Sequence, residues 1–266
     1  IGGGLMLLGA FLMIRFHAWF GLADALIATK ISFLGTGIWW AMFAIPAFKY
    51  LREDTFTGTI QPLASGLKGY LHTFTEIKEY PDLLRFLIAF LFYNDGIQTI
   101  IVVAAIFARE ELALSQGTIL SCFLMIQFVA MPCILLFGRL AEVYGAKRSL
   151  YLALVLFIVV TIFAYFMKTA WEFWLLGFVI ALILGGSQAV SRSLFSSLIP
   201  EGKHAEFFGF YAISAKFASV FGPLTFALIL DMTGSARLSI LALTFFFIVG
   251  ILLLTRVNTE NEISVS

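Results

Sequence analysis

The sequence predicts an all-α fold, a polytopic transmembrane helical bundle. Hydrophobic residues make up 61% of its 266 residues and charged residues only 12%, and the mean hydropathy is +0.99. A soluble domain typically has about 25% charged and 45–50% apolar residues. One buried core cannot hold so large an apolar excess, so we expect lipid to be the solvent around the helices.

Eight apolar segments follow one another along the chain. The first is too short to span a bilayer, and the others are about 17 to 25 residues long, which suits a hydrocarbon core about 30 Å thick. In order they are Ile1–Ile14, Ile31–Tyr50, Leu83–Phe107, Thr118–Phe137, Leu150–Met167, Trp174–Leu198, Phe207–Leu230 and Leu238–Leu254. Gly222-Pro223 predicts a kink in the seventh segment. Because residue 1 is an isoleucine inside an apolar run, we expect the protein to begin upstream of it.

The placement of basic residues predicts the orientation. If the loops alternate between the two sides, ten of the 17 Lys and Arg residues lie on one side and five on the other. The side richer in Lys and Arg faces the cytoplasm. This side includes the C-terminus.

The longest polar connection, residues 51–80, lies on the predicted cytoplasmic side. Apolar residues recur within it at helical spacing, at Leu67, Leu71, Phe74 and Ile77. This pattern predicts an amphipathic helix at the membrane interface, ending before Pro81. Such a helix would either join two bundles as a strap or serve as a plain linker with a lipid-facing stripe.

Three ionisable side chains fall within separate apolar segments, namely Asp95, Arg192 and Lys216. Each costs about 2.5–3.5 kcal/mol at the centre of a spanning helix, so it needs a partner, a water-filled cavity or an escape to the interface. Polar residues accompany the first two at helical spacing, and they are Asn94, Gln98, Gln188 and Ser191. We therefore predict that these seven residues line a pathway for a solute or a proton. Asp95 could instead be a structural clamp between helices, and Arg192 could reach the interface.

The loop after the fourth apolar segment reads Gly138-Arg-Leu-Ala-Glu-Val-Tyr-Gly-Ala-Lys-Arg148. It resembles the loop motif Gly-x-Leu-Ala-Asp-x-x-Gly-x-Lys-Arg of the major facilitator superfamily, with Glu142 where the motif has Asp. The resemblance implies a gating loop made by Gly138, Glu142, Gly145, Lys147 and Arg148. Physically, the two glycines would permit a tight turn and close helix approach. The alternative is a loop that only sets the topology.

Three further stretches resemble the vacuolar amino-acid effluxer-like branch of that superfamily. They are Tyr93-Asn-Asp-Gly-Ile-Gln98, Gly185-Gly-Ser-Gln-Ala-Val-Ser-Arg-Ser193 and Glu206-Phe-Phe-Gly-Phe-Tyr211. The resemblance implies a major-facilitator-like six-helix half plus two helices of the preceding half, the fifth to twelfth of twelve. Residues 1–50 would then be the tail of the N-terminal bundle, 51–80 the linker, 81–257 the C-terminal bundle and 258–266 a cytoplasmic tail.

In that family the first helix of each three-helix repeat lines the central cavity. The resemblance thus places Asp95 and Arg192 in cavity-lining helices, where we expect them to form a charge pair or a switching pair.

The predicted function is secondary active transport of small polar solutes, amino acids or related metabolites, by alternating access and in the direction of efflux. The expected partners are membrane lipid, the solute, a coupled proton and the missing N-terminal helices. Alternatives are a transport-inactive sensor or subunit and an intramembrane enzyme. For an enzyme the sequence offers no cluster of catalytic groups at one depth. We expect no cofactor and no metal, and a net charge of +1 gives no case for nucleic acid. The expected location is a bacterial cell (inner) membrane, or alternatively a vacuolar membrane.

Overall fold

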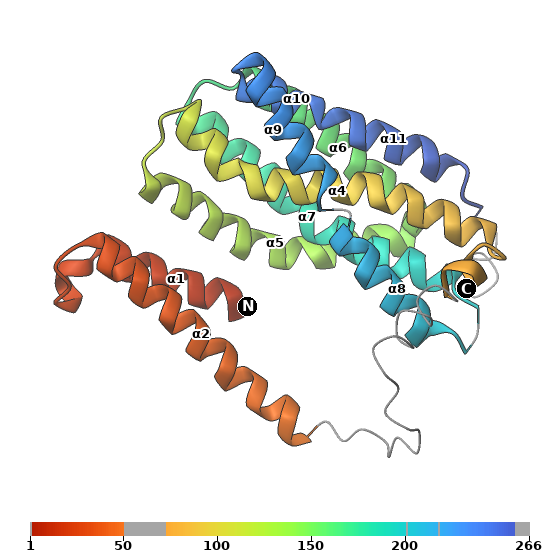
Figure 1. The fold of residues 1–266 in the computed structure, drawn as a ribbon, viewed down its shortest axis with the longest axis horizontal. Helices are drawn as coiled ribbons and strands as arrows, with labels where there is room; N and C mark the ends of the chain where they lie inside the picture. The colour runs from red at the N-terminus through yellow and green to blue at the C-terminus, as the bar shows by residue number, and fades with distance from the viewer. Residues whose placement is uncertain (1, 51–72, 201, 218, 259–266) are drawn as a thin grey trace.

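The computed structural model describes residues 2–50, 73–200, 202–217 and 219–258, and the regular structure in these ranges is helical (Figure 1). The elements are α1 (Gly2–Arg15), the 3₁₀ helix η1 (His17–Phe20), α2 (Ala25–Tyr50), α4 (Pro81–Glu110), α5 (Gln116–Tyr144), α6 (Ala146–Phe166), α7 (Ala170–Leu198), α8 (His204–Phe217), α9 (Phe221–Thr233), α10 (Ala236–Ala242) and α11 (Thr244–Thr255). Within the described ranges, seven helical stretches are long and apolar enough to cross a membrane. The predicted fold class, an all-α polytopic transmembrane bundle, is confirmed.

Two of the predicted segments are each divided into two helices. The segment Phe207–Leu230 is divided between α8, which ends at Phe217, and α9, which begins at Phe221. The break lies just before the Gly222-Pro223 pair, so Pro223 falls in the first turn of α9, where its missing N–H is not needed. The last segment is divided between α10 and α11 at Leu243, without a proline or glycine to signal the change.

Helix α4 is the central helix of the bundle formed by α4 to α11 (Figure 1). In its most apolar window 67% of the residues are buried, compared with 22% for α5. Its main apolar neighbour is α11. A methyl group added to Gly250 would lie 2.8 Å from Tyr93 Cβ, and one added to Gly96 would lie 2.9 Å from the Phe247 ring. The two helices therefore need glycine to approach this closely.

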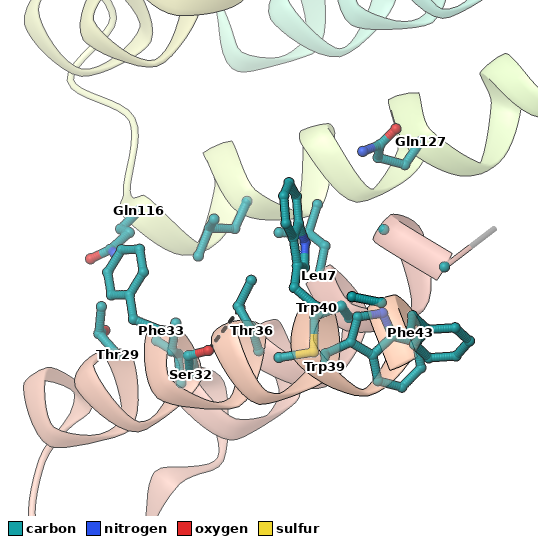
Figure 2. Close-up of a pocket in the computed structure, with 17 residues that line it drawn as sticks. Leu7, Thr29, Ser32, Phe33, Thr36, Trp39, Trp40, Phe43, Gln116 and Gln127 are labelled. Atoms are coloured by element: carbon teal, nitrogen blue, oxygen red, sulfur yellow. Dashed lines mark hydrogen bonds between the residues drawn. The ribbon is translucent and has the colours of Figure 1, made fainter. Parts of the chain in front are cut away.

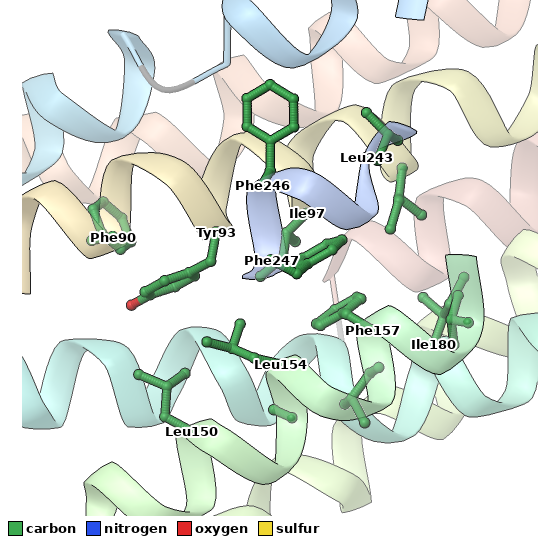
Figure 3. Packing of buried hydrophobic residues seen from close by; sticks show 14 of the residues in the cluster. Phe90, Tyr93, Ile97, Leu150, Leu154, Phe157, Ile180, Leu243, Phe246 and Phe247 are labelled. Atoms are coloured by element: carbon green, nitrogen blue, oxygen red, sulfur yellow. The ribbon is translucent and has the colours of Figure 1, made fainter. Parts of the chain in front are cut away.

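The same apolar core continues to α6 and α7. The rings of Phe157 and Phe247 stack with centroids 5.2 Å apart and an interplanar angle of 3° (Figure 3). Helices α5 and α7 make the largest contact in the bundle. Within it, a methyl group added to Gly186 would lie 2.2 Å from the Phe137 ring.

Polar contacts tie the helix ends together at one end of the bundle. Arg237, at the start of α10, pairs with Glu111 after α4, with Nε 2.9 Å from Oε2. Its Nη1 also donates to the carbonyls of Tyr165 (2.9 Å) and Met167 (2.6 Å), at the end of α6. Glu111 Oε1 accepts from the backbone N–H of Ala236 at 3.1 Å. One ion pair thus joins the ends of three helices.

A second set of contacts joins the opposite ends of α4, α6 and α11. Arg85 Nη1 donates to the carbonyl of Arg256 at 3.3 Å, and Asp82 Oδ1 accepts from the N–H of Asn258 at 3.0 Å. Lys147, at the start of α6, donates from Nζ to the carbonyl of Val257 at this end. Arg85, Lys147 and Arg256 are among the ten basic residues predicted on the cytoplasmic side, and they lie at the same end of the bundle.

The segment before α4 packs on α8. Residues 73–77 are helical and end before Pro81, whereas Leu67 and Leu71 of the predicted amphipathic helix lie outside the described residues. Ile77 is fully buried, and the Phe74 ring stacks on Phe210 with centroids 6.1 Å apart. The described end of this segment therefore turns much of its apolar side toward protein.

Polar groups add to this contact. Thr73 donates to Glu206, and Glu76 forms an ion pair with Lys203. Glu206 lies in the first turn of α8, and Lys203 lies just before that helix.

Helices α1 and α2 form a hairpin beside α5 (Figure 1). The contact with α5 is made at Gly4, where an added methyl group would lie 3.8 Å from Gln127 Cβ and Phe128. Most of α2 is exposed, including Phe33, Trp40 and Phe48.

Candidate functional site

Asp95 lies in the middle of α4 and is 1% exposed. Its Oδ2 accepts a hydrogen bond from the backbone N–H of Gly222 at 2.8 Å. Its other oxygen, Oδ1, is buried and has no hydrogen-bond partner among the described residues. The carboxyl group thus faces the first turn of α9.

Asn94, the residue before it, is also buried, and its Nδ2 donates to the carbonyl of Ala215 in the last turn of α8 at 3.4 Å. Gln98, one turn further along α4, is half-buried. Two adjacent side chains of α4 therefore contact the two helices on either side of the α8–α9 break.

The polar side of α7 divides into two rows. Ser187 and Ser191 point into the bundle and are buried, and Tyr93 donates from its hydroxyl to Ser191 Oγ at 2.8 Å. Gln188 is half-buried and Arg192 is exposed. Because successive helical residues are rotated by about 100°, the row with Gln188 and Arg192 turns away from the core. Ser191 is therefore part of the contact between α4 and α7, whereas the side chain of Arg192 is exposed and could bind a solute.

The expected charge pair between Asp95 and Arg192 does not form in this conformation. The reason is the register of α4: Tyr93 faces α7, and Asp95 is two positions further on, so it points to the other side of the helix, toward α9. Arg192 lies instead near Tyr211 of α8. Tyr211 itself is buried between Phe90 and Phe195, with ring centroids 4.3 Å and 4.7 Å away.

Lys216 is exposed in the last turn of α8. A cation there complements the negative end of the helix dipole. Lys216 is the penultimate residue of α8, close to the α8–α9 break, and it forms no ion pair with the described residues.

The loop motif makes one tight turn, at Gly145, whose φ of 87° favours glycine. No turn forms at Gly138, because it lies inside α5, and a methyl group added there would meet nothing within 4 Å among the described residues. Glu142 and Arg148 are exposed. Lys147 Nζ donates to the carbonyl of Val257 at 2.5 Å, and so stabilises the end of α11.

A cavity of about 790 Å³ lies between α1, α2 and α5 (Figure 2). None of the predicted pathway residues lines it. The hydroxyls of Thr29, Ser32 and Thr36 donate to carbonyls of their own helix, which leaves an apolar wall with the amides of Gln116 and Gln127. A cavity without a charged side chain does not suit a zwitterion, so the charged face of α7 is the better candidate for the site.

The family model described as "Vacuole effluxer Atg22 like" matches residues 1–264. The chain belongs to this branch of the major facilitator superfamily. Its resemblance to the effluxer branch, predicted from three short stretches, is therefore confirmed. With its apolar helices, this Atg22-like chain is part of an integral membrane protein.

Among its relatives is the "Uncharacterized MFS-type transporter YxiO" of Bacillus subtilis, 35% identical over 90% of this chain and 56% of the relative. "Autophagy-related protein 22-1" of Neosartorya fischeri is 29% identical over 85% of this chain and 41% of the relative. "Autophagy-related protein 22" of Yarrowia lipolytica is 27% identical, over 86% and 43%. The chain thus spans about half the length of these relatives. The name of the Bacillus subtilis relative and the description of the family point to transport.

Sequence reasoning missed the partners of the residues it selected. Tyr93 is next to the selected Asn94. The Gly222-Pro223 pair was a usable signal for Gly222, because it marks where a helix begins with free N–H groups. For the ion pair of Glu111 with Arg237 the sequence gives no such signal, since these residues are far apart in the chain.

Proposed function

We propose that this chain is part of a secondary active transporter that moves small polar solutes, amino acids or related metabolites, by alternating access in the direction of efflux. The observation that carries the proposal is the exposed Arg192 within α7, an apolar helix long enough to span a membrane. A charged guanidinium exposed to lipid has a high free-energy cost. The face of α7 that carries Arg192 must therefore contact water or protein. In a transporter built from two bundles, such a face lines the pathway between them.

The chemistry of this face suggests what the solute carries. A guanidinium binds a carboxylate through two parallel N–H···O contacts. Gln188, one helical turn before Arg192, offers an amide that can donate and accept hydrogen bonds. An amino acid presents both a carboxylate and an amine to such a pair. The word "effluxer" in the family's description supports the direction.

The relatives bear on the location as well. The Bacillus subtilis relative supports a bacterial cell membrane, and the fungal relatives support a vacuolar one as the alternative. We propose that the C-terminus faces the cytoplasm, that the helices contact membrane lipid and that N-terminal helices of the same protein complete the pathway. The loop from Gly138 to Arg148 would close against those helices in one state.

The test is solute counterflow in proteoliposomes that contain the whole protein, with a mixture of labelled amino acids. Arg192→Gln should abolish uptake of the label, and Arg192→Lys should restore part of it because the charge is kept without the bidentate geometry. Arg109→Gln is the matched control, since Arg109 is exposed at the end of α4. Unchanged counterflow in Arg192→Gln would contradict the assigned site. Absence of counterflow in the unmodified protein, with solute binding retained, would favour a transport-inactive sensor.

A further inference from the structure

The break between α8 and α9 lies against α4 at two adjacent residues. The last carbonyls of a helix and its first N–H groups have no partner within the helix. At this break, Asn94 of α4 donates to the carbonyl of Ala215 in α8, and Asp95 accepts from the N–H of Gly222 in α9. Each side chain therefore serves one of the two free helix ends.

The polarity of each side chain fits the end it serves. The carboxyl end of a helix carries partial negative charge and the amino end partial positive charge. The amide donor of Asn94 meets the carboxyl end of α8, and the carboxylate of Asp95 meets the amino end of α9. Val220, which precedes α9, has no side chain able to accept such a bond. Asp95 thus replaces the usual N-cap residue from a neighbouring helix.

Apart from the aromatic contacts of α8 and the packing of α9 on α10, few buried residues hold this part of the bundle. In the most apolar window of α8 and α9 only 18% of the residues are buried, compared with 67% in α4. Regions with few buried contacts open at low free-energy cost, so a small number of polar contacts can decide their position.

The close approach at Gly222 keeps the two caps in place. A methyl group added to Gly222 would lie 2.0 Å from Thr99 Oγ1 and 2.9 Å from Asp95 Oδ1. Thr99 also donates to the backbone carbonyl of Asp95 at 2.7 Å. Oδ1, the oxygen without a partner, therefore lies in the same small space as the hydroxyl oxygen of Thr99, which can accept a hydrogen bond.

A proton is the cation that fits this oxygen. The described residues contain no group of three His, Cys, Asp or Glu side chains able to hold a metal ion. The amino end of α9 also repels a cation that stays charged. A proton bound to Oδ1 neutralises the carboxylate, and this removes the cost of a buried charge but weakens the charge-assisted bond to Gly222.

We propose that Asn94 and Asp95 are positioning residues that cap the two helix ends at the α8–α9 break, and that a proton bound at Asp95 loosens α9. The proposal deepens the transport function. It rests on that function only for its consequence: proton binding would change the shape of the pathway wall. Other titratable and charged groups occur on the helices packed against α4, and these are Glu172 and Arg192 on α7, His204, Glu206, Tyr211 and Lys216 on α8, Asp231 on α9, Arg237 on α10, and Cys122, Cys133, Arg139, Glu142 and Tyr144 on α5; α11 has none.

The test is a nitroxide spin label at Val220, which is exposed in the break, in a protein whose native cysteines, Cys122 and Cys133 among them, are replaced by alanine. Spectra of the whole protein in lipid nanodiscs are recorded between about pH 8 and about pH 4, without solute. We expect the mobile component to grow as the pH falls. Asp95→Asn should give the large mobile component at every pH, and Asp95→Glu should keep the pH dependence.

Exchange of the two residues sharpens the test. The double variant Asn94→Asp, Asp95→Asn has the same composition, but it places a charged carboxylate against carbonyls and leaves only a neutral amide oxygen to accept from the N–H of Gly222. It should therefore be mobile at about pH 8, where the unmodified protein is not. Asp231→Asn, on the exposed side of α9, is the control and should behave as the unmodified protein.

A pH-independent spectrum in the unmodified protein, a pH dependence that survives in Asp95→Asn, or an exchanged variant that behaves as the original would overturn the proposal. Because no solute is present, these outcomes are independent of whether counterflow succeeds.

Discussion

Helix α4 makes two kinds of contact with its neighbours. Toward α11 it packs through Gly96, Gly250 and aromatic rings, with no polar group between the helices at these points. Toward α8 and α9 it packs through the hydrogen bonds of Asn94 and Asp95. Many small apolar contacts fix a single arrangement, whereas two hydrogen bonds can be changed by one proton or one substitution. The comparison shows that one helix can join a tightly packed core to a region whose position depends on a few hydrogen bonds.

The largest expected effect on stability comes from replacing Arg237 of α10, which holds the ends of α4 and α6 together. Arg237→Met should lower the free energy of unfolding by about 3 kcal/mol, because Glu111 and two carbonyls lose a charged donor. Thermal unfolding in detergent micelles measures this. Arg85→Met is the control, since its pair with Asp82 is half-exposed and contributes at most about 1 kcal/mol. Equal losses in the two variants would contradict the account of this end.

Gly250→Ala tests the apolar contact between α4 and α11. The added methyl group would lie 2.8 Å from Tyr93 Cβ and 3.3 Å from its backbone nitrogen, so we expect a loss of about 2 kcal/mol from overpacking.

The matched control is Gly209→Ala in α8, where the methyl group meets nothing within 4 Å. It should raise stability by up to about 1 kcal/mol through helix propensity. If Gly250→Ala also stabilised the protein, the tight packing of α11 on α4 would be wrong.

The smallest expected effect concerns the loop motif. Lys147→Met should cost about 1 kcal/mol, because the carbonyl of Val257 loses its donor. Arg148→Met should change stability by less than about 0.5 kcal/mol, since Arg148 is exposed. Unfolding measurements on the two variants check this difference. Equal costs would show that Lys147 does not stabilise the end of α11.

The sequence predicted the helices because apolar runs of spanning length have few other solutions. It also singled out Asp95, which the structure shows buried, because a carboxylate inside an apolar segment is conspicuous. It did not predict the partner, because which neighbour a side chain faces depends on helix rotation in the packed bundle. Tyr93 and Asp95 differ by two positions and face different helices. The two helix breaks also differed in how far the sequence predicted them. The Gly222-Pro223 pair indicated the break before α9, whereas no local residue indicated the break at Leu243.

Hydrogen exchange measured by mass spectrometry on the whole protein in nanodiscs tests most directly whether α4 joins a rigid core to a separately held α8–α9 region. We predict that peptides from α8 and α9 exchange faster than those from α4 and α11, and that Asp95→Asn speeds exchange in α8 and α9 alone. Uniform exchange across the bundle, or an effect of Asp95→Asn that spreads equally into α11, would contradict this account.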